Sequence, residues 1–263
     1  MPLLKDLEQF KNVSPALQWA IFIVAALIAL LAVVSLCVSV WLFFKYIRFN
    51  RKKNSANLSG GEVARKILDN NGLKNIRVST FGSFLFGNSY SHYFHKVRLR
   101  RLTCNKKSVT SLAMGAQKSS LAILDKNGDK DMKKRVLLTP LIFFGPVAFI
   151  PIVAVGVAVD YFMFNFTGVW TIIAAAIGFF FYLISFVLSI MVLKTEVKAQ
   201  KLACEILKKE NLATSDEVED MKELFKLYNI QYVNDIIMEF LQLVLRVLTF
   251  IAKMQNNSSS SGD

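Results

Sequence analysis

The chain has 263 residues, of which 54% are apolar, and a formal net charge of +13. This apolar fraction is too high for an ordinary soluble domain of this length. The three cysteines include no closely spaced pair, which excludes a disulfide framework and a cysteine-type zinc site; they are Cys37, Cys104 and Cys204.

Three apolar stretches account for the composition, and they lie within residues 15–46, 136–159 and 169–193. Each exceeds the ~20 residues that a helix needs to cross ~30 Å of hydrocarbon. The first is too long for the apolar region of a cleaved signal peptide, so we interpret it as a retained anchor. The sequence therefore predicts three transmembrane helices.

Basic residues predict the orientation of these helices. Clusters of Lys and Arg follow the first stretch, precede the second and follow the third (Lys45, Arg48, Arg51, Lys52 and Lys53; Lys130, Lys133, Lys134 and Arg135; Lys194, Lys198 and Lys201). By the positive-inside rule, the N-terminus lies outside, and residues 50–135 and 194–230 are cytoplasmic. Topology and contact with anionic lipid explain this charge better than nucleic-acid binding does.

The first half of the chain contains several local signals. Residues 1–14 place leucines near helical spacing among charges, which predicts a helix on the outer membrane surface. After a polar linker at 50–58, Ser59 and Glu62 form the S-x-x-E pattern of a capping box. Gly72 is placed to end that helix in a left-handed conformation.

Two short strands are expected next, at Ile76–Phe81 and Lys96–Leu99, followed by a helix at 108–124. That helix has the apolar spacing of a buried element. Its centre nevertheless reads Gln117-Lys118-Ser119-Ser120, and four consecutive polar residues in a core helix require an explanation.

The C-terminal part reads as helical from 194 to 230, then as an apolar helix at 231–253 and a disordered tail at 254–263. The apolar helix contains Asp235, Glu239 and Arg246. Because a charge at mid-bilayer costs ~2.5–3.5 kcal/mol or more, this helix either packs its charged face against protein or lies at the interface. The expected fold is a mostly α membrane protein with three transmembrane helices, an amphipathic or fourth C-terminal membrane helix and a small α+β cytoplasmic part.

The residues alone indicate no active site. The segment at 125–131, DKNGDKD, lacks the glycine and glutamate that an EF-hand calcium loop requires at its sixth and twelfth positions. His92 and His95 are the only histidines, and on a strand an i,i+3 pair would point to opposite faces. No Ser/His/Asp or Cys/His set can be assembled.

The sequence resembles a bacterial family of membrane-embedded neutral zinc metallopeptidases of the HExxH type. GEVARKILDNNGL at 61–73 is similar to that family's first helix, and His92-Tyr93 with Val97-Arg98-Leu99 to a DHYDPxxxxVRLS segment. Glu196-Val197-Lys198-Ala199-Gln200 corresponds to an EFNAS-like motif, and Leu241-Gln242-Leu243 with Arg246 to the family's ending. The resemblance extends over roughly residues 55–253 in collinear order.

The resemblance implies that the zinc site has been lost. The HExxH positions hold Gln117, Lys118, Ser119, Ser120 and Leu121. In the family motif two histidines bind zinc and the glutamate activates its water. Here a poor ligand, a cation and an apolar side chain occupy those three positions. Glu196 matches the expected carboxylate ligand, and it is placed to form an ion pair with Lys118.

We expect no catalytic residue and no cofactor, and a binding or scaffold role in a complex with other membrane proteins of a bacterial plasma membrane. One alternative is an active peptidase with a non-standard metal site formed by His92, His95 and Glu196. Another is a transporter or channel component, which few intramembrane charges in one chain disfavour. Metal content separates the scaffold from the peptidase, and co-purifying partners separate it from the transporter.

Overall fold

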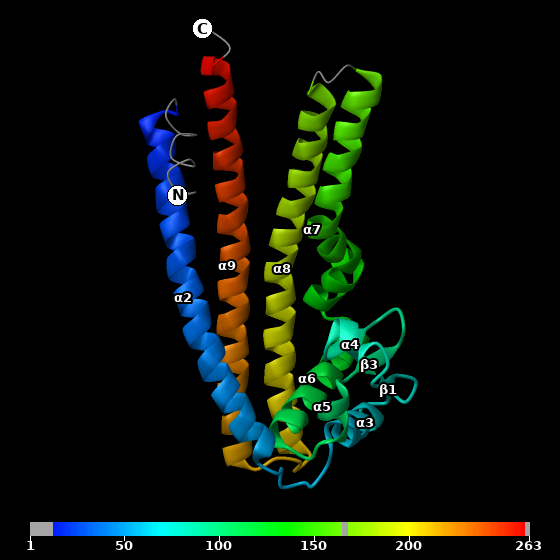
Figure 1. The fold of residues 1–263 in the computed structure, drawn as a ribbon. Helices are drawn as coiled ribbons and strands as arrows, with labels where there is room; N and C mark the ends of the chain where they lie inside the picture. Colours follow the sequence, from blue (N-terminus) through cyan, green and yellow to red (C-terminus); the bar gives the residue numbers. More distant parts are fainter. Residues whose placement is uncertain (1–12, 165–167, 261–263) are drawn as a thin grey trace. The chain divides into compact units, whose positions relative to one another are not determined.

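A computed structural model describes residues 13–164 and 168–260, apart from the side chains of Phe86, 140–149, Met254 and 257–260. Most of the chain is helical (Figure 1). The expected surface helix at 1–14 lies outside the described residues except for Val13 and Ser14. The elements are α2 (Pro15–Arg51), α3 (Gly60–Asn70), β1 (Arg77–Ser79), α4 (Ser83–Phe86), β2 (Ser89–Ser91), β3 (Lys96–Arg98), α5 (Arg101–Asn105), α6 (Val109–Lys126), α7 (Lys130–Met163), α8 (Val169–Lys209) and α9 (Ser215–Ser260).

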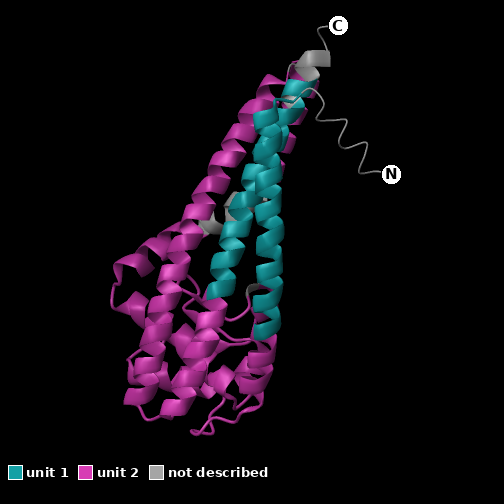
Figure 2. Cartoon of the chain, turned by 90° about the vertical axis from the view of Figure 1, so that its left-hand side faces the viewer, with its two compact units in different colours: residues 1–41, 230–263 teal, residues 42–229 magenta. Residues whose placement is uncertain are grey.

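The chain divides into two compact units (Figure 2), and the smaller one comprises residues 1–41 and 230–263. In this unit the first part of α2 lies beside the last part of α9. Gln231 Nε2 donates to Ser35 Oγ over 2.9 Å and to Asp235 Oδ1 over 2.8 Å. Asp235, one of the three charges in the apolar 231–253 segment, therefore has a polar partner within the unit.

The larger unit, residues 42–229, contains the sheet, α3 to α6 and a helical hairpin of α7 and α8. The hairpin helices approach closely, because a Cβ added at Gly156 would lie 2.4 Å from the Cβ of Ala174. The Asp160 carboxylate accepts from the backbone N–H of Trp170 and Thr171, at 3.2 and 2.6 Å. Asp160 on α7 thus satisfies orphan donors at the start of α8.

Among the described residues, two helices are long and apolar enough to cross a membrane, namely α2 and α8. The apolar segment of α7 that the described residues include is Ile150–Met163, which is shorter than a membrane span. The expected span at 136–159, and with it a total of three or four spans, therefore stays a prediction.

The sheet has the order β1-β3-β2, with β1 parallel and β2 antiparallel to β3. Its inner face packs on α6, which also contacts α3 and α8. The capping box is confirmed, since Ser59 accepts from Glu62 N and Glu62 accepts from Ser59 N. The helix expected at 108–124 is α6, and the two expected strands are β1 and β3. The short elements β2, α4 and α5 are not among the predicted ones.

The C-terminal region differs from the sequence-based expectation. A single helix, α9, runs from Ser215 to Ser260, where two helices and a disordered tail from residue 254 were expected. Adding a residue to an existing helix costs far less than nucleating a new one, so weak helix formers such as Asn and Ser can extend a long helix.

Candidate functional site

The polar segment of α6 lies in the interior of the larger unit. Ser108 caps α6 by accepting from Ser111 N, and every residue from Val109 to Ile123 is buried. The helix comes very close to α3, because a Cβ at Gly115 would lie 2.4 Å from the Gly60 carbonyl oxygen. This close crossing puts Ser119 beside α3, where its hydroxyl donates to the Ala64 carbonyl over 3.3 Å.

Glu196 of α8 is the centre of the site. Its Oε2 accepts from Gln117 Nε2 and from Lys118 Nζ, each at 2.8 Å. Its Oε1 accepts from Arg135 Nη2 of α7, also at 2.8 Å, and the other Arg135 nitrogen donates to Thr195 Oγ1. One carboxylate thereby joins α6, α7 and α8.

The electrostatics of this cluster favour an ionised Glu196. Its side chain is only 17% exposed, and those of Lys118 and Arg135 are 11% and 18% exposed. Burial acts against ionisation, but the charges of Lys118 and Arg135 and their hydrogen bonds outweigh it and lower the pKa of Glu196 to about 2. The carboxylate is thus charged at neutral pH and balanced by two cations.

The position that would carry the second histidine is apolar. Leu121 is 1% exposed and forms a small cluster with Met132 and Ala199. At the first histidine position, the Gln117 amide is engaged with Glu196, and at the base position the Lys118 ammonium contacts the same carboxylate. Catalytic zinc requires three protein ligands such as His₂Glu and an open position. These residues offer one carboxylate already bound by two cations, so they do not fit a zinc ion.

A second ionic cluster lies beside the first, at the start of α7. Asp129 caps α7 by accepting from the backbone N–H of Asp131 and Met132. Lys198 of α8 donates to Asp129 over 2.9 Å and also to Asp131, which accepts from Lys194 as well. Asp129 and Asp131 of the DKNGDKD segment are thus engaged with lysines, and Asp129 also with helix N–H groups, so both serve as structural residues.

The structure changes the expected setting of the two histidines. His92 and His95 lie in the turn between β2 and β3, and not on a strand, with ring centroids 6.0 Å apart. His92 Nδ1 lies 2.6 Å from Asp125 Oδ2, which also accepts from the Tyr90 hydroxyl. Within residues 13–164 and 168–260, no three His, Cys, Asp or Glu side chains form a group able to hold a metal. The alternative ligand set of His92, His95 and Glu196 is therefore not assembled.

A family model described as "Putative neutral zinc metallopeptidase" matches residues 22–251, which is most of the chain. The chain belongs to this family. Searches of the curated proteins and of the solved structures found no match. The family membership accounts for the collinear motifs of the sequence. The chain has only two histidines, His92 and His95, and its sequence contains no HExxH.

Sequence reasoning missed one member of the site. Arg135 was interpreted only as a topological charge, although it forms a two-pronged contact with Glu196 and Thr195. The only available signal was its place at the border of an apolar stretch, where a basic side chain can face either protein or the lipid headgroups.

Proposed function

We propose that this member of the zinc metallopeptidase family is a catalytically inactive membrane protein that acts as a binding or scaffold subunit of a membrane protein assembly. The observation that supports the proposal is the set of bonds that the Glu196 carboxylate makes. Its carboxylate bonds to Gln117, Lys118 and Arg135, at the place where the family motif implies a metal. A lysine in place of the general base opposes both metal binding and activation of water.

The membrane part of the proposal is a multi-pass protein with spans at 15–46, 136–159 and 169–193 and an external N-terminus. The apolar character of α2 and α8 and the basic residues at their cytoplasmic borders support it. Single cysteines at Asn127 and Phe164, in a chain whose native cysteines are replaced by alanine, test it. We expect an impermeant maleimide added to intact cells to label the cysteine at 164 and not the one at 127. The reverse pattern would contradict the orientation.

The inactivity is tested by counting zinc in the full chain, purified in mild detergent without chelator. We expect far less than one zinc per chain in a folded sample, and no peptide hydrolysis when zinc is added. About one tightly bound zinc per chain would overturn the proposal, since structural and catalytic zinc sites bind stoichiometrically.

The scaffold role is tested in native membranes. After mild solubilisation, we expect the chain to migrate in an assembly larger than its own 29.7 kDa and to retain defined membrane proteins after cross-linking. Replacing Glu196 should break up this assembly, whereas the exposed Lys194→Ala change should not. A chain that stays monomeric in its native membrane would contradict this role.

A further inference from the structure

The outer face of the three-stranded sheet gathers positive charge. The parallel register of β1 and β3 pairs Arg77 with Lys96 and Ser79 with Arg98, while the intervening pair of Val78 and Val97 packs on the core. Like charges directly opposite each other destabilise a sheet. The facing side chains of Arg77 and Lys96 therefore repel each other and destabilise the sheet. An anion bound between them would attract both and make their electrostatic contribution to stability favourable.

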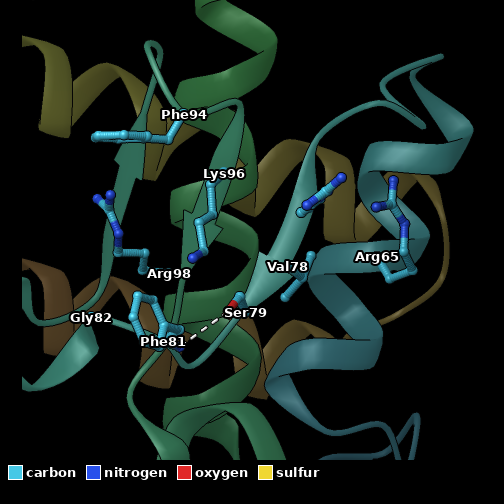
Figure 3. A pocket seen from close by; sticks show the side chains of 9 residues that line it. Arg65, Val78, Ser79, Phe81, Gly82, Phe94, Lys96 and Arg98 are labelled. Atoms are coloured by element: carbon cyan, nitrogen blue, oxygen red, sulfur yellow. Dashed lines mark hydrogen bonds between the residues drawn. The ribbon is translucent and has the colours of Figure 1, made fainter.

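These side chains line a groove of about 900 Å³ that combines cations with aromatic rings. None of the nine lining residues drawn in Figure 3 is acidic. Arg65 forms one wall and is occupied by Asp69 and by the carbonyl oxygens of Leu73 and Ile76. The Lys96 ammonium lies 5.0 Å from the Phe81 ring centroid. Three further cations line the groove, from Arg77, Lys96 and Arg98, and the Arg98 guanidinium lies 5.4 Å from the Phe94 ring centroid.

Large apolar side chains stand out into solvent around the groove. Phe81 is 81% exposed and Phe94 is 70% exposed, and the neighbouring α4 exposes Phe84 to 94% and Leu85 to 77%. Such isolated, protruding rings next to Lys and Arg are typical of surfaces that insert into the headgroup region of a bilayer. A peptide ligand would instead favour pockets that enclose its side chains.

The groove begins near the expected membrane border. The hydroxyl of Tyr93, in the turn between β2 and β3, donates to the Val136 carbonyl of α7 over 3.2 Å. Val136 is the first residue of the predicted apolar stretch of α7. Phe94 is the next residue in the same turn, and in Figure 3 it lies at one end of the groove. This end of the groove is thus level with the point where α7 is proposed to enter the bilayer.

From these observations we infer that the groove binds the phosphate-bearing headgroup of an anionic phospholipid at the cytoplasmic surface. The guanidinium groups of Arg77 and Arg98 and the ammonium of Lys96 contact the phosphate, as these groups do in other phosphate sites. Phe81, Phe84 and Phe94 lie among the adjacent headgroups. The inference rests on the proposed topology but not on the loss of the zinc site.

The first test is lipid retention by the full chain in detergent, titrated with phosphatidylglycerol or phosphatidylcholine and read by native mass spectrometry. We expect phosphatidylglycerol to be preferred. Arg77→Gln with Lys96→Gln and Arg98→Gln should lower its retention about ten-fold or more, because each basic residue near an anionic surface adds to the attraction. The matched control removes three exposed charges away from the predicted membrane border, at Lys208 and Lys209 of α8 and Lys226 of α9, and should change retention less than two-fold. Equal losses in both variants would overturn the proposal.

Two competitors identify the source of the anion. Inorganic phosphate that displaces the lipid at millimolar concentration would indicate a small-anion site and contradict a lipid headgroup. An acidic peptide that binds the groove more tightly than phosphatidylglycerol would replace the lipid with a protein partner. We expect neither, because the aromatic contacts require a bilayer surface or a lipid.

A second test leaves the three cations unchanged and so does not depend on how the charge variant folds. A fluorophore on Leu85→Cys, with the native cysteines replaced by alanine, is placed in nanodiscs with brominated phosphatidylglycerol. We expect quenching of this label, and none of a label at Asn127→Cys. An unquenched label at 85 would overturn the proposal. If the label at 85 is not quenched while the maleimide labels the cysteine at 164 and not the one at 127 in cells, the lipid proposal fails and the proposed topology stands.

Discussion

Lys118 of α6 and Glu196 of α8, 78 residues apart in the sequence, form an ion pair with a distance of 2.8 Å between Nζ and Oε2. The resemblance to the HExxH family implies that these two positions correspond to the general base and the carboxylate ligand of a zinc site. Here the carboxylate connects to α6 through the ammonium and to α7 through Arg135. The Glu196 carboxylate therefore joins three helices of the larger unit, α6, α7 and α8.

Removing Glu196 should destabilise the protein more than removing Lys118. Glu196→Gln leaves two largely buried cations without an anion, which we expect to cost about 3–5 kcal/mol, whereas Lys118→Ala leaves Glu196 paired with Arg135 and should cost less. Adding Lys118→Ala to Glu196→Gln should recover part of the loss. The measurement is thermal unfolding in mild detergent. Lys194→Ala, at a lysine that is 65% exposed, is the control and should change the stability by about 0–1 kcal/mol. Silent changes at both Glu196 and Lys118 would rule out the ion pair.

The Glu196 carboxyl should also make stability depend on acid pH. Its pKa is lowered from 4.5 to about 2 in the fold. The stabilisation is therefore fully present above about pH 4.5 and is lost as the pH falls through about 2. The Tm difference between the wild type and Glu196→Gln should narrow over this range, because a protonated Glu196 resembles glutamine. Asp129 and Asp131 also have lowered pKa values, but they are common to both proteins and cancel in the comparison. A constant difference from about pH 6 to pH 2 would contradict the assignment.

Restoring the motif should restore metal binding. Gln117→His, Lys118→Glu and Leu121→His together provide two imidazoles one helical turn apart and remove the competing ammonium. We expect about one zinc per chain by mass spectrometry in this triple variant. The matched variant keeps Lys118 and carries only the two histidines, and it should bind far less zinc. Equal zinc in both variants would show that Lys118 does not block the site.

Glu217 should be important for attaching the 50–58 linker within the larger unit. It is 3% exposed, and it accepts from Ser55 N and Ser55 Oγ at 2.6 Å each and from Thr214 N at 2.8 Å. Glu217→Ala leaves these donors without an acceptor, which costs about 1–3 kcal/mol. The neighbouring Asp216→Ala removes an exposed acid from the same helical turn and should stay within about 0.5 kcal/mol. Similar urea midpoints for the two variants would contradict this role.

The features that depend on local pattern could be predicted from the amino-acid sequence. The capping box at Ser59 and Glu62, the buried helix at 108–124 and the apolar helices were readable because helix starts, periodicity and length are encoded within a few turns of chain. The family motifs added one long-range expectation, the meeting of Lys118 with Glu196. Local pattern failed at β2, because Ser89-Tyr90-Ser91 lacks the β-branched valine that β1 and β3 each contain.

The contacts between distant groups could not be predicted in this way and depend on the packing of the folded chain. The tertiary structure placed Arg135 on Glu196, His92 on Asp125 and Glu217 on Ser55, across separations of 61, 33 and 162 residues. It also set the register that puts Arg77 beside Lys96. Side-chain partners at such distances depend on helix crossings and strand pairing, which in turn depend on packing of the whole unit. The residues of the site can therefore be read along the chain, but the set of charges that holds Glu196 exists only once α6, α7 and α8 have packed together.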